Sequence, residues 1–301
     1  MAYRAGHWTW ALLFRTYCRY CVPRRQPAAC FIVTMGKVGT IAFKHALHRH
    51  GFDFVTVTHR IGRGGPEFPH TPPVQHTETR ARRILYERHH PWLLRQRPVK
   101  VLTAVREPIE RLVSLYLFVY PRLFGEPVET TPMEILLQRF PTFFETEYRY
   151  HLVPGDFFQR EICHHLDIDV FAWNFPTEQG WGRIRQAGID LLVLKLEAGH
   201  AAHCDGLSQW AERTITEIPI TNTSSERGYG DIYADFKQRV RIPFAYADAL
   251  YRSAFMSHFY TEAERIAAWQ RWEPQLDRTL VLPAWIQASL ARHHPPATTR
   301  R

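Results

Sequence analysis

The amino-acid sequence predicts an α/β fold in which helices flank a central parallel sheet, and two observations support this class. Short apolar, β-branched segments alternate along the chain with segments whose apolar residues repeat at helical spacing. Glycine or proline stands at many of the borders between them, where it ends one element and starts the next. Because strand–helix–strand crossovers are right-handed, this alternation predicts parallel strands in one sheet. The C-terminal third of the chain is expected to be helical.

Four segments are expected to form buried strands, and a tight loop leads from the first of them into a helix. Gly36 follows the first segment, and from Thr40 onward the apolar residues change to helical spacing. Pro108 follows the third segment at a position suited to the first turn of a helix. The four strand segments are residues 29–35, 52–58, 99–105 and 190–196.

The remaining segments are assigned by their turn and capping residues. Residues 62–76 are rich in glycine, proline and histidine and are expected to form a long loop, followed by a helical stretch at 77–90. Thr131 with Glu134, and Thr261 with Glu264, have the spacing of capping boxes, so a helix is expected to begin at each.

Length and charge limit the number of domains and the kind of partner. With 301 residues, 45% of them hydrophobic and 22% charged, the chain can bury a large core. The 38 Lys and Arg against 29 Asp and Glu give a net charge of +9, which favours partners that carry phosphate, sulfate or carboxylate. We expect one α/β domain over residues 29–285, a basic aromatic segment at 1–28 and a disordered tail at 286–301.

The cysteines and the first residues bear on location. The five cysteines are too few and too scattered for a disulfide framework, which favours a reducing, cytoplasmic setting. Cys18 and Cys21 form a C-x-x-C without a second pair, so no metal site is expected. The apolar run at 8–14 is too short for a membrane span, and we expect no signal peptide. For segment 1–28 two interpretations stay open, a helix packed on the domain or peripheral contact with a membrane or anionic partner.

The loop between the first strand and the following helix is a candidate anion site. Its sequence is Gly36-Lys37-Val38-Gly39-Thr40-Ile41. Glycines let the backbone approach a ligand, the helix N-terminus favours an anion, and Lys37 adds a full positive charge. The loop lacks the G-x-x-x-x-G-K-[ST] pattern, which disfavours hydrolysis of nucleoside triphosphates.

A second candidate anion site begins at the end of the third strand. Carboxyl ends of parallel strands are where open α/β sheets bind ligands, and Arg106 stands at such an end. Ser114, two turns into the next helix, could donate its hydroxyl to the same anion. The alternative is an exposed Arg106 paired with Glu107 or Glu110 and a serine that faces water.

Together the two motifs resemble the sulfotransferases that use 3′-phosphoadenosine 5′-phosphosulfate (PAPS). In that family a K-x-G-T loop holds the 5′-phosphosulfate, and an Arg with a Ser eight residues later holds the 3′-phosphate. The resemblance covers residues 29–270 and includes a bacterial branch named for capsular polysaccharide synthesis, which resembles this chain at 221–237 and 257–261. The matching residues are Lys37, Gly39 and Thr40 for the first motif and Arg106, Pro108 and Ser114 for the second.

The resemblance implies a P-loop-like three-layer sandwich, PAPS as donor, PAP as product and a hydroxyl acceptor, most naturally a carbohydrate. It implies donor contacts from Gly36 to Ile41, from Arg106 and from Ser114. Arg227 and Tyr229 are also assigned to donor binding, although the branch has Lys-Trp-Tyr where this chain has Arg227-Gly228-Tyr229. Met35, where many relatives have proline, is a second departure.

For the chemical step the sequence offers Lys37 as the cation at the leaving oxygen and His59 as the base. His59 ends the second strand and therefore reaches the same edge of the sheet as the Lys37 loop. An unperturbed imidazole titrates near neutral pH, which suits proton abstraction. No metal is required. The other candidates for the base are His70, His76, Glu67 and Glu78.

Three other functions stay open. The first is a non-catalytic anion or glycan binder on the same fold, which would need only the basic surface. The second is a nucleotide-dependent kinase, which is disfavoured because this chain lacks the triphosphate-binding loop. The third is nucleic-acid binding, which is disfavoured because the positive residues are scattered. Trp173, Phe175 and Trp181 are read as core or as an acceptor site, and His258 likewise. The pairs His89-His90 and His164-His165 are read as exposed helix residues.

Overall fold

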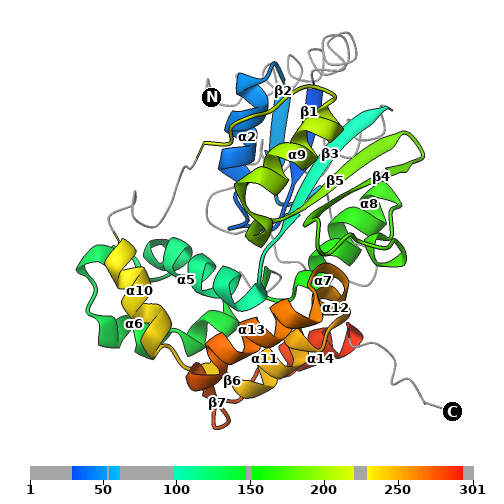
Figure 1. Ribbon diagram of the computed structural model, residues 1–301. Coiled ribbons are helices and arrows are strands. Elements are labelled where there is room, and N and C mark those ends of the chain that lie inside the picture. The colour runs from blue at the N-terminus through cyan, green and yellow to red at the C-terminus, as the bar shows by residue number, and fades with distance from the viewer. Residues whose placement is uncertain (1–28, 53, 62–97, 147–150, 220–228, 294–301) are drawn as a thin grey trace, which may run out of the picture.

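The computed structural model describes residues 29–52, 54–61, 98–146, 151–219 and 229–293. The expectations for the N-terminal segment 1–28, the loop 62–76 and the helical stretch 77–90 lie outside these residues. Within them the chain forms one five-stranded sheet and a helical half below it (Figure 1).

The central sheet has the order β2-β1-β3-β5-β4 and is parallel except at one edge. Strand β4 pairs antiparallel with β5, so the expectation of a wholly parallel sheet is wrong at this edge. The four predicted strands all form, and β4 is an additional strand that the sequence analysis missed. The strands are β1 Ala29–Val33, β2 Phe54–Thr58, β3 Val99–Val105, β4 Trp181–Gln186 and β5 Ile189–Lys195.

The register brings the carboxyl ends of the strands level with one another. Val33 of β1 is opposite Thr58 of β2, so the residues that follow each strand are neighbours. Strand β1 lies between β2 and β3, and the chain passes from β1 to β2 on one side before it returns to β3 on the other. The crevice between β1 and β3 is therefore a topological switch point, where open α/β sheets bind ligands.

Helices α2 (Thr40–Arg49) and α9 (Gly199–Ala211) cover one face of the sheet (Figure 1). Phe43 and Leu47 of α2 are fully buried against the strands, as the helical spacing of the sequence predicts. Helix α5 (Pro108–Phe124) leaves the end of β3 and runs into the helical half. Its N-cap is Glu107, whose carboxylate accepts hydrogen bonds from the N–H groups of Ile109 and Glu110.

The C-terminal third is helical, as expected, with a two-stranded pairing of β6 (Ile242–Pro243) and β7 (Leu276–Asp277). None of the described helices is both long and apolar enough to span a membrane. The remaining described α-helices are α6 Met133–Arg139, α7 Pro154–Phe157, α8 His164–Leu166, α10 Gly230–Arg239, α11 Phe244–Tyr251, α12 Ala254–Phe259, α13 Glu262–Trp272 and α14 Ala284–Arg292, and a π-helical turn, Phe158–Cys163, joins α7 to α8.

The expected domain boundary at residue 285 falls inside helix α14. Ile286 and Leu290 of this helix are buried, and Asp156 of α7 accepts hydrogen bonds from Ser289 and from His293. Burial of an apolar face and these polar contacts fix the helix to the domain. The ordered domain therefore continues to His293, and the boundary drawn from the sequence is corrected.

One of the two expected capping boxes forms. Thr261 caps α13, and Glu264 reaches back to the N–H of Thr261 while it also receives the ammonium of Lys195 at 2.6 Å. At the other site the N-cap is Pro132, and the Thr131 hydroxyl donates to the carbonyl of Pro127 at 2.7 Å instead. The Thr131 hydroxyl thus bonds within the preceding turn and does not cap α6, as the sequence pattern had predicted it would.

A buried carboxylate joins the sheet to the helical half just behind the end of β3. Glu107 accepts hydrogen bonds from the hydroxyl of Tyr251 at 2.7 Å and from the indole of Trp272 at 3.2 Å. Burial raises the pKa of Glu107, although its hydrogen bonds oppose the shift. These contacts fix the position from which Arg106 projects.

Candidate functional site

A pocket of about 1070 Å³ opens at the switch point between β1 and β3. Its walls come from the loop after β1, the end of β2, the residue after β3, one face of α5 and the start of α9. The predicted residues that line it are Gly36, Lys37, Gly39, Thr40, Ile41, His59, Arg106 and Ser114. The structure therefore brings eight residues from four separate segments into one cavity.

The loop after β1 adopts a backbone that is costly for most residues. Lys37 has a φ of 70° and Gly39 a φ of 79°, both in the left-handed region. For a residue with a Cβ this region costs about 1 to 2 kcal/mol, and strain of this kind clusters at functional sites. At Gly39 a Cβ would also lie 3.0 Å from a methyl group of Leu196, so both the backbone conformation and the limited space favour glycine there. The ammonium of Lys37 lies 4.7 Å from the ring centre of Phe118.

The N-terminus of α2 completes this side of the pocket. Gly39 is the N-cap and has no side chain to accept a hydrogen bond from the first turn. Thr40 is buried, and its hydroxyl pairs with that of Thr34 at 2.8 Å. A helix N-terminus without a side-chain cap and with a nearby lysine can bind a phosphate or sulfate group.

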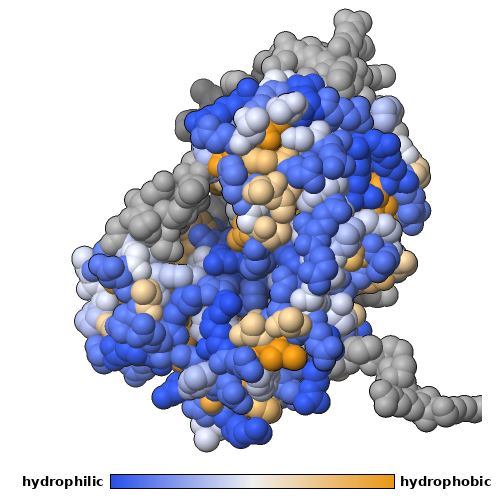
Figure 2. Space-filling view, viewed as in Figure 1, coloured by the Kyte–Doolittle hydropathy of each residue, from blue (hydrophilic) through white to orange (hydrophobic). Residues whose placement is uncertain are grey.

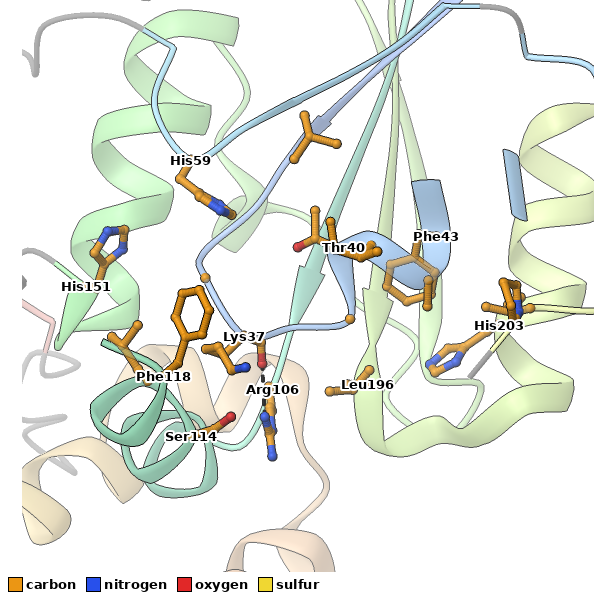
Figure 3. A pocket seen from close by; sticks show the side chains of 18 of the residues that line it. Lys37, Thr40, Phe43, His59, Arg106, Ser114, Phe118, His151, Leu196 and His203 are labelled. Atoms are coloured by element: carbon orange, nitrogen blue, oxygen red, sulfur yellow. Dashed lines mark hydrogen bonds between the residues drawn. The ribbon is translucent and has the colours of Figure 1, made fainter. Parts of the chain in front are cut away.

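Arg106 connects the end of β3 to this loop (Figure 3). Its Nη1 donates to the carbonyl oxygen of Lys37 at 3.0 Å, and its Nη2 donates to the hydroxyl of Tyr233 at 3.4 Å. Nη2 also lies 3.6 Å from the carboxylate of Glu110, which is one of the pairings that the sequence analysis left open. Arg106 lines the pocket all the same, so it belongs both to an ion pair and to the cavity wall.

Glu110 is the carboxylate that holds the cations on this side of the site. It accepts hydrogen bonds from the ammonium of Lys237 and, at 2.9 Å, from the hydroxyl of Tyr233. Burial opposes its ionisation, but Lys237 and Arg106 prevail and lower its pKa. Glu110 is therefore an anion, and it orients Arg106 and Tyr233 together.

Ser114, Phe118 and Arg122 lie along one face of α5, because they are spaced four residues apart. Ser114 is buried, as a hydroxyl at a pocket wall rather than one that faces water. Phe118 is 47% exposed, unusual for a phenylalanine, and its ring faces the loop at Lys37 (Figure 3). The sequence analysis named Ser114 alone, although the same helical spacing would have added the other two.

His59 directly follows β2 and lines the pocket on the far side of Lys37 from Phe43 and His203 (Figure 3). Its Nδ1 is 2.6 Å from the carbonyl oxygen of Thr34. A carbonyl can only accept, so Nδ1 carries the proton and donates it. In the neutral ring Nε2 is then the basic nitrogen, the tautomer that a general base in this position needs.

The pocket wall sets the protonation of His59. The side chain is accessible to solvent within the pocket, yet protein surrounds it, and this desolvation lowers its pKa. The hydrogen bond to Thr34 and the charge of Glu161 oppose the shift without cancelling it. His151 lies beside it with the ring centres 6.5 Å apart, and burial holds the pKa of His151 well below the usual range. Neither imidazole adds a positive charge at neutral pH.

For three of the predicted site residues, the structure describes no side chain in the cavity wall. Val38 is fully buried in the core, so the role predicted for it depends on its backbone N–H alone. Tyr229 is buried at the start of α10 and is absent from the cavity wall, whereas Tyr233, one turn later, lines it. Arg227 lies outside the described residues, as do the alternative bases His70, His76, Glu67 and Glu78 and the pair His89-His90.

The aromatic residues and His258, for which the sequence left core and acceptor site as alternatives, lie in the core or pack against it. Phe175 and Trp181 are buried, and the ring of Trp173 meets that of Phe175 edge to face with the ring centres 6.0 Å apart. His258 packs against Phe171 and Phe259 away from the pocket. Of the pair in α8, His164 is exposed and His165 is half-buried. None of these residues lines the described wall of the pocket at Lys37.

Sequence reasoning missed several residues of the cavity wall. Tyr233, His151, His200 and His203 reach it from segments far apart in the chain, and no local pattern marks them as pocket residues. His203 donates from Nε2 to the carbonyl of Lys195 at 2.8 Å and therefore has a structural partner. Within the described residues no group of three or more His, Cys, Asp or Glu side chains is arranged to hold a metal ion.

Comparison with known proteins adds no relative to this description. No protein-family model, no curated protein and no solved structure matches the chain.

Proposed function

We propose that this chain is a PAPS-dependent sulfotransferase on a P-loop-like three-layer fold, and that it transfers a sulfonate group to a hydroxyl, most naturally of a carbohydrate. One observation carries the proposal. Two candidate anion sites at neighbouring strand ends, Lys37 and Arg106, line a single cavity that also contains His59. The resemblance of both motifs to that family gives the anion its identity.

In the proposed complex the donor spans the two motifs. Lys37 and the N–H groups at the start of α2 hold the 5′-phosphosulfate, and Arg106 with Ser114 holds the 3′-phosphate. A guanidinium and a hydroxyl suit a phosphate dianion because both donate to its oxygens. The hydroxyl of Tyr233 accepts from Arg106 and donates to Glu110, so it helps to orient the guanidinium that faces this group.

The transfer needs a base, a leaving-group cation and alignment, and this chain offers a residue for each. His59 Nε2 takes the acceptor's proton as the acceptor oxygen bonds to sulfur. The bond from sulfur to the bridging oxygen breaks, and Lys37 stabilises the charge that grows on that oxygen. A donor aimed at such a charge is worth about 3 to 4 kcal/mol. PAP and the sulfated acceptor leave, and the proton passes from His59 to solvent.

The proposal is tested by calorimetric titration followed by mass spectrometry. PAP is expected to bind far more tightly than adenosine 5′-monophosphate, because only PAP presents a 3′-phosphate to Arg106. Incubation with PAPS and a panel of glycans, lipids and alcohols is then expected to add the mass of one SO₃ group to an acceptor. Lys37→Ala should lower the rate of this transfer by about 10² to 10³-fold.

Each alternative gives a different result in the same titration. A non-catalytic anion or glycan binder would take up PAP without transfer to any acceptor. A kinase would prefer ATP to PAP, and a nucleic-acid binder would prefer single-stranded DNA. We also propose a cytoplasmic location, on the strength of the scattered cysteines alone.

A further inference from the structure

The described part of the cavity wall carries positive charge and no carboxylate. Among the described residues that line it, the ionisable side chains are lysine, arginine, histidine and tyrosine, with no Asp or Glu. Lys37 and Arg106 are assigned to the donor under the proposed function. The third positively charged side chain in the wall is that of Arg122, to which the proposed donor complex assigns no role.

Arg122 lies too far along α5 to serve the 3′-phosphate. It is eight residues beyond Ser114, and a helix rises about 1.5 Å per residue, so it is displaced along the axis by about 12 Å. Phe118 lies between the two on the same face, next to Lys37. The charge of Arg122 therefore belongs to the part of the pocket beyond Lys37.

That part is the side on which the base lies. Figure 3 shows His59, His151 and Phe118 on one side of the Lys37 loop, and Phe43, Leu196 and His203 on the other. We call the first group, together with Arg122, the base arm. An acceptor whose hydroxyl reaches His59 Nε2 must lie in the base arm, because the proton it loses is taken there.

A buried guanidinium group beneath the base arm, that of Arg111, adds to its positive potential. Arg111 is fully buried, donates from Nη2 to the carbonyl of His151, and has no hydrogen-bond partner for Nε or Nη1 among the described residues. Arg160 is also buried, and the carboxylate of Glu161 at 2.6 Å offsets most of its charge. Both guanidinium groups lie close enough to His151 to disfavour its protonation. Charges in a poorly solvated interior act over longer distances than surface charges.

We propose that the acceptor is itself an anion, with a carboxylate or sulfate group that Arg122 binds while its hydroxyl faces His59. The proposal rests on the proposed function, since that function defines which side of Lys37 receives the acceptor. The half-exposed ring of Phe118 offers an apolar surface to the acceptor between these two contacts. Arg122 is thus a specificity-determining residue. The described face shown in Figure 2 is largely hydrophilic, with smaller apolar areas between.

The test compares three hexasaccharides that differ only in charge, titrated into the full chain with PAP at saturation. Unsulfated chondroitin hexasaccharide carries carboxylates, its carboxyl-reduced 4-sulfated form carries sulfates, and its carboxyl-reduced unsulfated form is neutral. At low salt at least one charged form is expected to bind about tenfold more tightly than the neutral form, because a charge-assisted contact with arginine contributes that much. The charged form that binds better identifies the anionic group.

Two variants assign the preference to its residue. Arg122→Gln is expected to bring the three affinities within about twofold of one another, because it removes the one charge-assisted contact proposed here. It should leave PAP affinity unchanged. Arg252→Gln, at an exposed arginine paired with Asp248, is the matched control and should retain the preference. Equal affinity for all three hexasaccharides, or no binding of either charged form, overturns the proposal. A preference that survives Arg122→Gln also overturns it.

The PAP titration separates this inference from the proposed function. If PAP does not bind, the proposed function fails, and the hexasaccharide titrations are repeated without PAP to judge the anion preference alone. If PAP binds and the three hexasaccharides do not differ, only the inference about the acceptor fails.

Discussion

Replacement of Arg106 by glutamine is the sharpest test of the donor site, because the expected effect depends on one phosphate group. Two charge-assisted hydrogen bonds to a 3′-phosphate contribute about 1.5 to 3 kcal/mol each. Part of this is offset, since Arg106 must loosen its contacts with Glu110 at 3.6 Å and Tyr233 at 3.4 Å. We expect Arg106→Gln to weaken PAP binding by about 3 kcal/mol, or about 100-fold in Kd.

The assay is a cycle of four titrations, with PAP and adenosine 5′-monophosphate each added to the native chain and to Arg106→Gln. If Arg106 contacts the 3′-phosphate, the variant loses affinity for PAP and changes by less than about threefold for the monophosphate. Arg106→Lys keeps the charge but loses the planar fork, so it should fall between the two. Thermal denaturation of each variant establishes that the fold is intact.

The cycle is needed because Arg106 also touches the loop. Its Nη1 donates to the carbonyl of Lys37 at 3.0 Å, so the variant could disturb the 5′ site indirectly. An indirect effect weakens both nucleotides alike, whereas a direct contact weakens only PAP. Equal losses for the two ligands would refute the assignment of Arg106 to the 3′-phosphate.

Three further results are expected. Lys37→Ala should lower kcat by about 10² to 10³-fold, whereas the affinity for PAP should fall far less. Steady-state kinetics and calorimetric titration measure the two effects, and an unchanged kcat would exclude Lys37 from the transfer. The transfer rate should rise with pH on the acidic side of the pH–rate profile, with a midpoint below 6.5. The reason is that desolvation lowers the pKa of His59 and only the neutral ring accepts a proton. His59→Ala should remove this acidic limb of the profile together with turnover. Glu161→Gln should lower the free energy of unfolding by about 3 to 5 kcal/mol in urea denaturation, since it breaks a buried pair with Arg160, and a loss under about 1 kcal/mol would contradict this reading.

The predictable parts of the molecule are those encoded by neighbouring residues. Buried strands are continuous apolar runs, so β3 was predicted at its full extent and β5 within one residue at each end. The loop at Lys37 and the start of α5 at Pro108 also follow from a few adjacent residues. Because these segments contain both anion motifs, the sequence was enough to predict Lys37, Arg106, Ser114 and His59 as pocket residues.

The parts that were missed depend on packing between distant segments. Strand β4 is half-exposed at the sheet edge and carries two arginines and a glycine, so it lacks the apolar run that marks a strand. His151 reaches the base arm because Arg111 binds its carbonyl, a contact between residues forty positions apart. Helix α14 was read as a tail, although Asp156 of α7 secures it. No local pattern contains these contacts.

The strained loop ties the fold to the candidate site. Lys37 stays in a left-handed conformation because the residues around it leave no better alternative. Arg106 donates a hydrogen bond to the carbonyl of Lys37, and Val38 is buried in the core. Gly39 leads the chain into α2 at a point where a Cβ would crowd Leu196. Strain that is fixed by several independent contacts persists in the folded state. Since one of those contacts is Arg106, the two candidate anion sites form a single preset unit, and their spacing is decided by the pairing of β1 with β3 before any ligand arrives.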